Sequence, residues 1–233
     1  MGSFSYLTIN FVAIFALIKF KYIIRCREHI RRELCLLNNK SRDHKPEVIK
    51  EIGLTYEDYA AIDDGNRYEL TEGQLELMSP APSITHQIIS FELQKKIAKS
   101  CELNYLILNA PVDVILSASE IRQPDIVLVK RDRLDIVSNR GIEGAPDLVI
   151  EILSPSTLKR DKIDKLEVYA RFHISEYWIV DPNSGVLEQF ELREERYELH
   201  NIFQEDELIT SPNIPCVSFT MNMIMDNIPD LSD

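Results

Sequence analysis

Hydrophobic and polar residues follow one another along most of the chain in a pattern that predicts a series of helices and strands. Apolar residues at helical spacing predict helices over residues 54–62, 85–101 and 160–172. Alternation on both sides of a turn predicts β-hairpins over residues 67–78 and 186–200. Runs of aliphatic and aromatic residues predict further strands over residues 112–116, 125–129, 148–153 and 177–180. This order predicts an α/β fold with a mixed central sheet, flanked by helices and extended by additional β-hairpins.

Two acidic residues stand in strands that are otherwise apolar. Asp125 opens a strand that continues as Ile-Val-Leu-Val, and Glu151 interrupts Leu-Val-Ile-Glu-Ile-Leu. Strands of this kind are buried, and a carboxylate in them is costly unless it is paired, protonated or bound to a cation. The alternatives are turn chemistry at Pro-Asp for Asp125 and a solvent-facing position for Glu151.

Lysine is the third residue type in this pattern, beside the two carboxylates. Lys162 and Lys165 both lie at the border of the apolar stripe on the helix over residues 160–172, and helical spacing alone does not separate them. A lysine beside two carboxylates can hold or deprotonate an attacking water, while a Mg²⁺ bound by the carboxylates takes up negative charge on a phosphoryl oxygen. Together these residue types indicate metal-dependent hydrolysis of a phosphodiester.

Motifs in a fixed order connect these residues. From about residue 54 to residue 200 the chain resembles the Uma-type family of putative restriction endonucleases, which have the PD-(D/E)XK nuclease fold. The matching stretches are Tyr68-Glu-Leu-Thr-Glu-Gly73, Met78-Ser-Pro80 with His86, Gln123-Pro-Asp-Ile-Val127, Ala145-Pro-Asp-Leu-Val-Ile-Glu-Ile-Leu-Ser-Pro-Ser-Thr157, Asp161 with Lys165 and Tyr169, and Glu176-Tyr-Trp-Ile-Val-Asp-Pro182.

The resemblance implies a restriction-endonuclease-like fold and an endonuclease that hydrolyses DNA with Mg²⁺, for which Mn²⁺ could substitute. It implies that Asp125 and Glu151 are metal ligands and catalytic residues, and that Lys165 is the catalytic lysine. Leu153 stands where the motif places its lysine, so the resemblance implies that this function has moved to the following helix. Glu69 matches a family glutamate, which implies an additional metal ligand, with an exposed hairpin carboxylate as the alternative.

Other polar and aromatic residues receive structural interpretations. His86, at the start of a predicted helix, is interpreted as a polar cap or structural contact rather than a base, and Tyr169 and Trp178 as core residues. The four cysteines form no Cys-x-x-Cys pair, and the five histidines show no metal-finger spacing, which argues against structural zinc. We therefore expect the cysteines to be free thiols in a reducing cytosol.

The net charge of the chain argues against tight binding to DNA. The chain has 26 basic and 38 acidic residues, a formal charge of −12. Residues 1–45 carry nine basic and three acidic side chains, so their charge of +6 leaves −18 on residues 46–233. An acidic domain repels DNA at long range. The alternative function is therefore a catalytically inactive nuclease fold used for binding or assembly. A homodimer, which could form a composite cleft, stays open.

The amino-terminal segment is apolar and then basic. Residues 4–24 are short and interrupted for a spanning helix, which needs about 20 apolar residues. A membrane anchor, a basic amphipathic arm and an extension irrelevant to the main activity all stay open, and in each of them we expect the main domain to be cytoplasmic. The expected division is an extension over residues 1–50, a nuclease-like domain over residues 51–225 and an acidic tail over residues 226–233.

Overall fold

The structure, a computed structural model, describes residues 53–78, 81–154 and 160–231. The chain divides into two units, Met1–Glu51 and Ile52–Asp233, and the described residues all belong to the second. The expectations for the amino-terminal segment therefore lie outside the described residues. Within those residues, none of the helices is long and apolar enough to cross a membrane.

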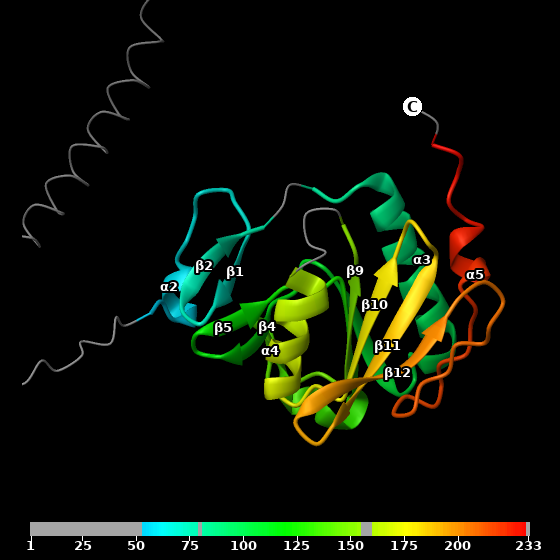
Figure 1. Cartoon of the computed structure of the whole chain (residues 1–233). Coiled ribbons are helices and arrows are strands. Elements are labelled where there is room, and N and C mark those ends of the chain that lie inside the picture. Colours follow the sequence, from blue (N-terminus) through cyan, green and yellow to red (C-terminus); the bar gives the residue numbers. More distant parts are fainter. Residues whose placement is uncertain (1–52, 79–80, 155–159, 232–233) are drawn as a thin grey trace, which may run out of the picture. The chain divides into compact units, whose positions relative to one another are not determined.

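Helices and strands follow the predicted order, with several elements that the sequence pattern did not predict (Figure 1). The helices are α2 (Tyr56–Ala60), α3 (Ile84–Cys101), α4 (Lys165–Arg171) and α5 (Asn222–Met225), with a 3₁₀ helix at Arg131–Ile136 and a π-helix at Arg160–Asp164. The strands are β1 (Tyr68–Thr71), β2 (Gln74–Leu77), β3 (Tyr105–Asn109), β4 (Val114–Ser117), β5 (Glu120–Arg122), β6 (Ile126–Lys130), β7 (Val137–Ser138), β8 (Gly141–Glu143), β9 (Leu148–Ile152), β10 (Glu176–Asp181), β11 (Val186–Arg193) and β12 (Arg196–Phe203). All three predicted helices and both predicted hairpins are present.

The strands form two mixed sheets rather than one. The first has the order β2-β1-β5-β4-β8-β7, and the second has the order β12-β11-β10-β9-β6-β3. Parallel pairing occurs between β4 and β8 and between β9 and β10, and the other paired strands are antiparallel. The predicted fold class is confirmed, and the second sheet is an addition to it.

Helices cover the two faces of the second sheet (Figure 1). Side chains alternate between the faces of a strand. On one face Ile126 and Ile150 pack against α3 through Ile89 and Leu93. On the other face Val149 packs against α4 in a separate cluster. Because both faces are covered, β6 and β9 are apolar along almost their whole length, as the sequence indicated.

The β1–β2 hairpin brings a buried carboxylate next to the second sheet. Its two-residue turn is Glu72-Gly73, and both residues have positive φ, 50° and 78°. Such turns match the right-handed twist of the paired strands. Register in this hairpin pairs Glu69 with Glu76, and of these two only Glu69 is fully buried.

A disulfide joins Cys101, at the end of α3, to Cys216 in the carboxy-terminal segment, across a sequence separation of 115 residues. The expectation of free thiols is therefore wrong for these two residues. Spacing did not reveal the pair, because the two cysteines become neighbours only when the carboxy-terminal segment packs against α3.

Candidate active site

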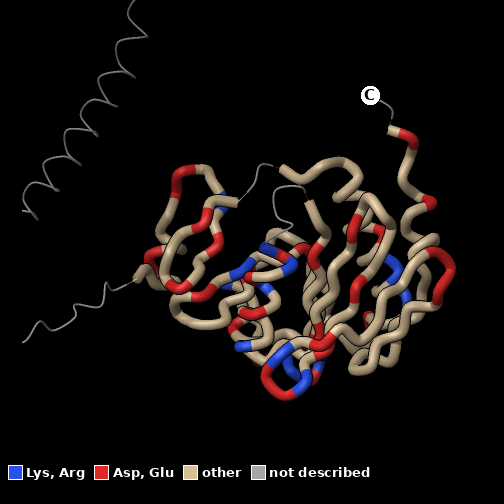
Figure 2. The backbone as a smooth tube through the Cα atoms, viewed as in Figure 1, with Lys and Arg blue, Asp and Glu red and all other residues tan. Residues whose placement is uncertain are grey.

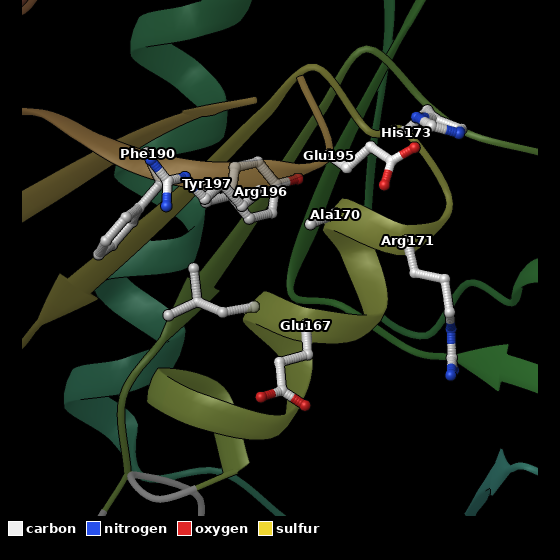
Figure 3. A pocket seen from close by; sticks show the side chains of 9 residues that line it. Glu167, Ala170, Arg171, His173, Phe190, Glu195, Arg196 and Tyr197 are labelled. Atoms are coloured by element: carbon white, nitrogen blue, oxygen red, sulfur yellow. The ribbon is translucent and has the colours of Figure 1, made fainter. Parts of the chain in front are cut away.

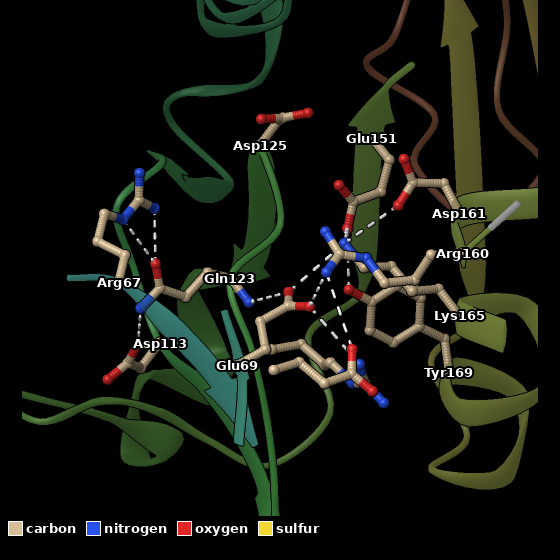
Figure 4. Close-up of polar contacts among 12 residues, drawn as sticks. Arg67, Glu69, Asp113, Gln123, Asp125, Glu151, Arg160, Asp161, Lys165 and Tyr169 are labelled. Carbon is tan, nitrogen blue, oxygen red and sulfur yellow. Dashed lines mark hydrogen bonds and ion pairs between the residues drawn. The ribbon is translucent and has the colours of Figure 1, made fainter. Parts of the chain in front are cut away.

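Strand register brings Asp125 and Glu151 to neighbouring positions. Ile126 of β6 is paired with Ile150 of the antiparallel strand β9, so the next position along the two strands places Asp125 opposite Glu151. Both residues line one cavity of about 850 Å³. Figure 4 shows Asp125 at the start of β6 and Glu151 on β9, with the lysine-bearing helix beside Glu151.

Lys165 contacts Glu151 directly. Its Nζ atom lies 2.6 Å from Glu151 Oε1 and 3.4 Å from Asp161 Oδ1, and the lysine side chain is only 2% exposed. Lys162 instead pairs with Glu188 at 2.7 Å and is 35% exposed. The structure therefore separates the two lysines that helical spacing left equivalent, and places Lys165 at the carboxylate pair.

Glu151 is a buried carboxylate with one engaged oxygen. Its Oε1 accepts hydrogen bonds from Lys165 and, at 3.0 Å, from the Tyr169 hydroxyl. Burial raises the pKa of Glu151 well above its usual range, and the neighbouring carboxylates of Asp161 and Asp125 raise it further, although Lys165 acts in the opposite direction. Burial is therefore the main cause of the raised pKa of Glu151, and a cation bound beside this residue would favour its ionised form.

Asp125 also uses one oxygen for its protein contacts. Its Oδ2 accepts a hydrogen bond from the Ile152 backbone N–H at 2.8 Å and lies 3.2 Å from His86 Nε2. Among the described residues, no hydrogen bond reaches Asp125 Oδ1 or Glu151 Oε2. Within the described residues, each member of the pair thus has one carboxylate oxygen that could contact a cation.

His86 connects α3 to this end of the sheet. Its Nε2 lies 3.1 Å from the Ile152 carbonyl oxygen as well as near Asp125, and its Nδ1 is buried and has no hydrogen-bond partner among the described residues. Burial lowers the pKa of His86, but the hydrogen bond and charge of Asp125 outweigh burial and raise it. His86 is not the helix cap: the cap is Ser83, whose hydroxyl oxygen accepts from the His86 backbone N–H. The interpretation of His86 as a structural contact agrees with this geometry.

Glu69 has a different environment from the Asp125–Glu151 pair. Its Oε1 accepts from the Gln123 backbone N–H at 2.9 Å and lies 3.5 Å from Lys165 Nζ. Its Oε2 lies 3.6 Å from Arg122 and 3.5 Å from Arg160. Burial raises the pKa of Glu69, but these three cations outweigh burial and lower it to about 2. Such surroundings favour a carboxylate that holds Lys165 in place over a carboxylate that ligates a metal.

Asp161 and Arg160 are candidate site residues to which the sequence analysis gave no role, although Asp161 belongs to one of the matching stretches. Both line the cavity, and Asp161 is buried, with no hydrogen bond to its Oδ1 from the described residues. Asp161 precedes Lys165 by four residues, which places the two side chains on the same helix face. This spacing was the available signal, although the π-helix between them makes the exact phase unpredictable.

The carboxylate pair suits a magnesium ion better than a zinc ion. Within the residues that the structure describes, no three acidic, histidine or cysteine side chains converge to enclose a metal. Mg²⁺ does not require such a cage, because it usually keeps several waters and binds one or two carboxylates together with substrate phosphate. The free oxygens of Asp125 and Glu151 fit this requirement.

A second cavity, of about 570 Å³, lies between α4 and the β11–β12 hairpin (Figure 3). None of the predicted site residues lines it. Asp125, Glu151 and Lys165 line the first cavity instead.

Comparisons with known proteins agree with the fold described above. The family model described as Uma2, putative restriction endonuclease, matches residues 55–223. A crystal structure of a putative nuclease belonging to DUF820 from Anabaena variabilis is similar to this chain, with a TM-score of 0.62 and 18% sequence identity. The similarity covers 74% of this chain and 98% of that chain, and at this identity it shows the fold alone. No curated protein sequence matches the chain.

Proposed function

The chain belongs to the Uma2 family of putative restriction endonucleases, and from this membership we propose that it is a Mg²⁺-dependent endonuclease that hydrolyses phosphodiester bonds in DNA. Membership of this family supports nuclease activity. The choice of metal and of DNA as substrate rests on the chemistry of the cavity, with Mn²⁺ as a substitute for Mg²⁺.

A single observation carries the proposal: two carboxylates on adjacent strands share a cavity with a buried lysine. Asp125 and Glu151 would hold the cation through their free oxygens, and neither residue would have to release its present hydrogen bonds. When bound, the cation would supply charge neutralisation at the phosphoryl oxygen and a lowered pKa for a water molecule.

Lys165 has the geometry of the motif lysine although it comes from another element. The residue two positions after Glu151 is Leu153, which is buried in the apolar cluster under α4. Lys165 reaches Glu151 from α4 instead, at 2.6 Å. We assign Lys165 the role of holding the attacking water and stabilising developing negative charge, with Glu69 and Asp161 fixing its ammonium group.

A second function is favoured by one observation, the charge of the domain. Residues 46–233 carry a formal charge of −18, and Figure 2 shows no continuous band of Lys and Arg along the part of the chain drawn in colour. A nuclease fold that has lost catalysis and binds another partner would tolerate such a surface. Cleavage of DNA by the full chain with Mg²⁺, and its loss in Glu151→Gln, decides between the two functions.

A further inference from the structure

One wall of the catalytic cavity is a row of uncharged polar side chains on α3. Residues at intervals of three and four share a helix face, and four such residues line the cavity: Ser83, Gln87, Ser90 and Gln94. Asn109 of β3 extends the row, since its Oδ1 accepts a hydrogen bond from Gln94 Nε2 at 3.1 Å. Amides and hydroxyls can hydrogen-bond the edges of nucleobases as well as phosphate oxygens, but they carry no charge that would attract a phosphate backbone.

An exposed aromatic ring lies in this wall. Phe91 of α3 lines the cavity and is 61% exposed. Lys95, one turn further along the helix, places its Nζ 5.3 Å from the centre of the ring. Isolated apolar residues on a surface need no explanation, but this ring is in the wall of the cavity that contains the carboxylate pair. Aromatic rings in such positions are platforms on which nucleobases stack.

The cations that line the cavity do not form a row of charges for a phosphate backbone. Arg160 pairs with Glu69 and Lys165 pairs with Glu151. Arg67 keeps its charge but donates to the neutral amide of Gln123. Duplex DNA carries one charge for each ~1.7 Å of its axis, and proteins bind it mainly by neutralising those charges. The cavity is therefore equipped for bases rather than for the backbone of an intact duplex.

We propose that the cavity receives an unpaired nucleotide, whose base stacks on Phe91 and hydrogen-bonds to Gln87, Gln94 or Asn109. The substrate is then single-stranded DNA, or DNA with unpaired bases beside the cleaved bond. This inference rests on the proposed nuclease function and specifies its substrate class.

Size and position agree with this assignment. A volume of about 850 Å³ is within the range of pockets that hold small ligands, roughly 300–1,000 Å³, and suits one or two nucleotides. Phe91 lines the same cavity as Asp125 and Glu151, so a base on its ring and a phosphate at the carboxylate pair would belong to the same bound strand.

Binding without cleavage tests the base site first. We would titrate the full chain, in EDTA, into single-stranded oligonucleotides that contain 2-aminopurine, whose fluorescence falls when the base stacks on a ring. Phe91→Ala and Phe91→Leu should weaken binding by roughly 5- to 150-fold, the fold-change expected for one stacked base, and Phe91→Trp should retain it. Leu103→Ala removes another exposed apolar side chain, 86% exposed and outside the cavity lining, and should have no effect.

Cleavage with Mg²⁺ then compares a single strand, an intact duplex and a duplex with unpaired bases. The two substrates with unpaired bases should be cleaved faster than the intact duplex, and Phe91→Ala should raise KM for them. If no DNA is cleaved but the fluorescence change depends on the ring of Phe91, the nuclease proposal fails and the base site stands. If all three substrates are cleaved equally and Phe91→Ala changes neither binding nor KM, the base site is overturned and the nuclease proposal stands.

Discussion

Lys165 Nζ lies 2.6 Å from Glu151 Oε1, although 14 residues separate them and they belong to different elements, β9 and α4. The lysine is held in this place by two further carboxylates, Glu69 and Asp161. Removing a buried ammonium group with three acidic neighbours should lower the free energy of unfolding. The same group can reach a water held beside the carboxylate pair.

Replacement of Lys165 should affect both catalysis and stability. Lys165→Met should slow cleavage by about 10²–10⁴-fold, the usual contribution of a positioned proton-transfer group. It should also lower the free energy of unfolding by about 3–5 kcal/mol, because buried carboxylates lose their cation. Lys162→Met is the matched control: its pair with Glu188 is partly exposed and should be worth about 0–1 kcal/mol. Urea unfolding and cleavage rates check both variants, and a larger loss in Lys162→Met would contradict this assignment.

Magnesium should stabilise the folded protein through Asp125 and Glu151. At a concentration 100 times the dissociation constant, binding to the folded state alone should raise the melting temperature by roughly 5–10 °C. The double variant Asp125→Asn, Glu151→Gln should show no rise, because both free oxygens are lost as anionic ligands. Glu167→Gln, on the exposed side of α4, should respond like the wild type. An equal rise in the double variant would place the cation elsewhere.

Acid should remove the stabilisation that ionised Glu69 provides. The pKa of Glu69 is about 2 in the folded protein against an ordinary 4.5. A lowered pKa contributes stability that is present above pH 4.5 and is lost as the pH falls from 4.5 towards 2, here roughly 3 kcal/mol. The difference in unfolding free energy between wild type and Glu69→Gln should therefore be constant near neutral pH and shrink below pH 4.5. A difference that stays unchanged down to pH 2.5 would show that Glu69 is not held as an anion.

The disulfide between Cys101 and Cys216 should be chemically detectable and stabilising. Alkylation of the denatured, unreduced protein should leave Cys101 and Cys216 unlabelled, since these two residues are bonded to each other. The double variant Cys101→Ala, Cys216→Ala should lose about 2–4 kcal/mol of unfolding free energy, the usual effect of removing such a constraint. Labelling of Cys101 and Cys216 before reduction would contradict the presence of this disulfide in the isolated protein.

Much of the architecture could be predicted because its causes are local. The helix α3 follows from apolar residues at helical spacing. The β1–β2 hairpin follows from alternation around Glu72-Gly73, whose positive φ values suit a tight turn. The division into two sheets could not be predicted, because β5 has only three residues and its neighbours are chosen by long-range packing. Strand β3 was missed because it follows α3 after a short turn and carries no alternation of its own.

Candidate site residues could be selected from the sequence where a polar residue stands in apolar surroundings. Asp125 precedes an apolar strand and Glu151 interrupts one, and this conflict selected both as candidates. The choice of Lys165 over Lys162 was not predictable from spacing, because the π-helix at Arg160–Asp164 changes the phase of the helix. The resemblance selected Glu69 as a metal ligand, but its ion pairs could not be predicted, since the three cations around it come from β5, the π-helix and α4.

The central claim is that a cation-dependent nuclease site is built on Asp125, Glu151 and Lys165. The most direct test is cleavage of circular DNA, single-stranded and supercoiled, by the full chain with Mg²⁺ and with EDTA, alongside Glu151→Gln and the control Glu167→Gln. We predict that the wild type and Glu167→Gln cleave DNA with Mg²⁺ and not with EDTA, and that Glu151→Gln does not cleave. Cleavage by Glu151→Gln at the wild-type rate, or no cleavage of either DNA by the wild type, would contradict the claim.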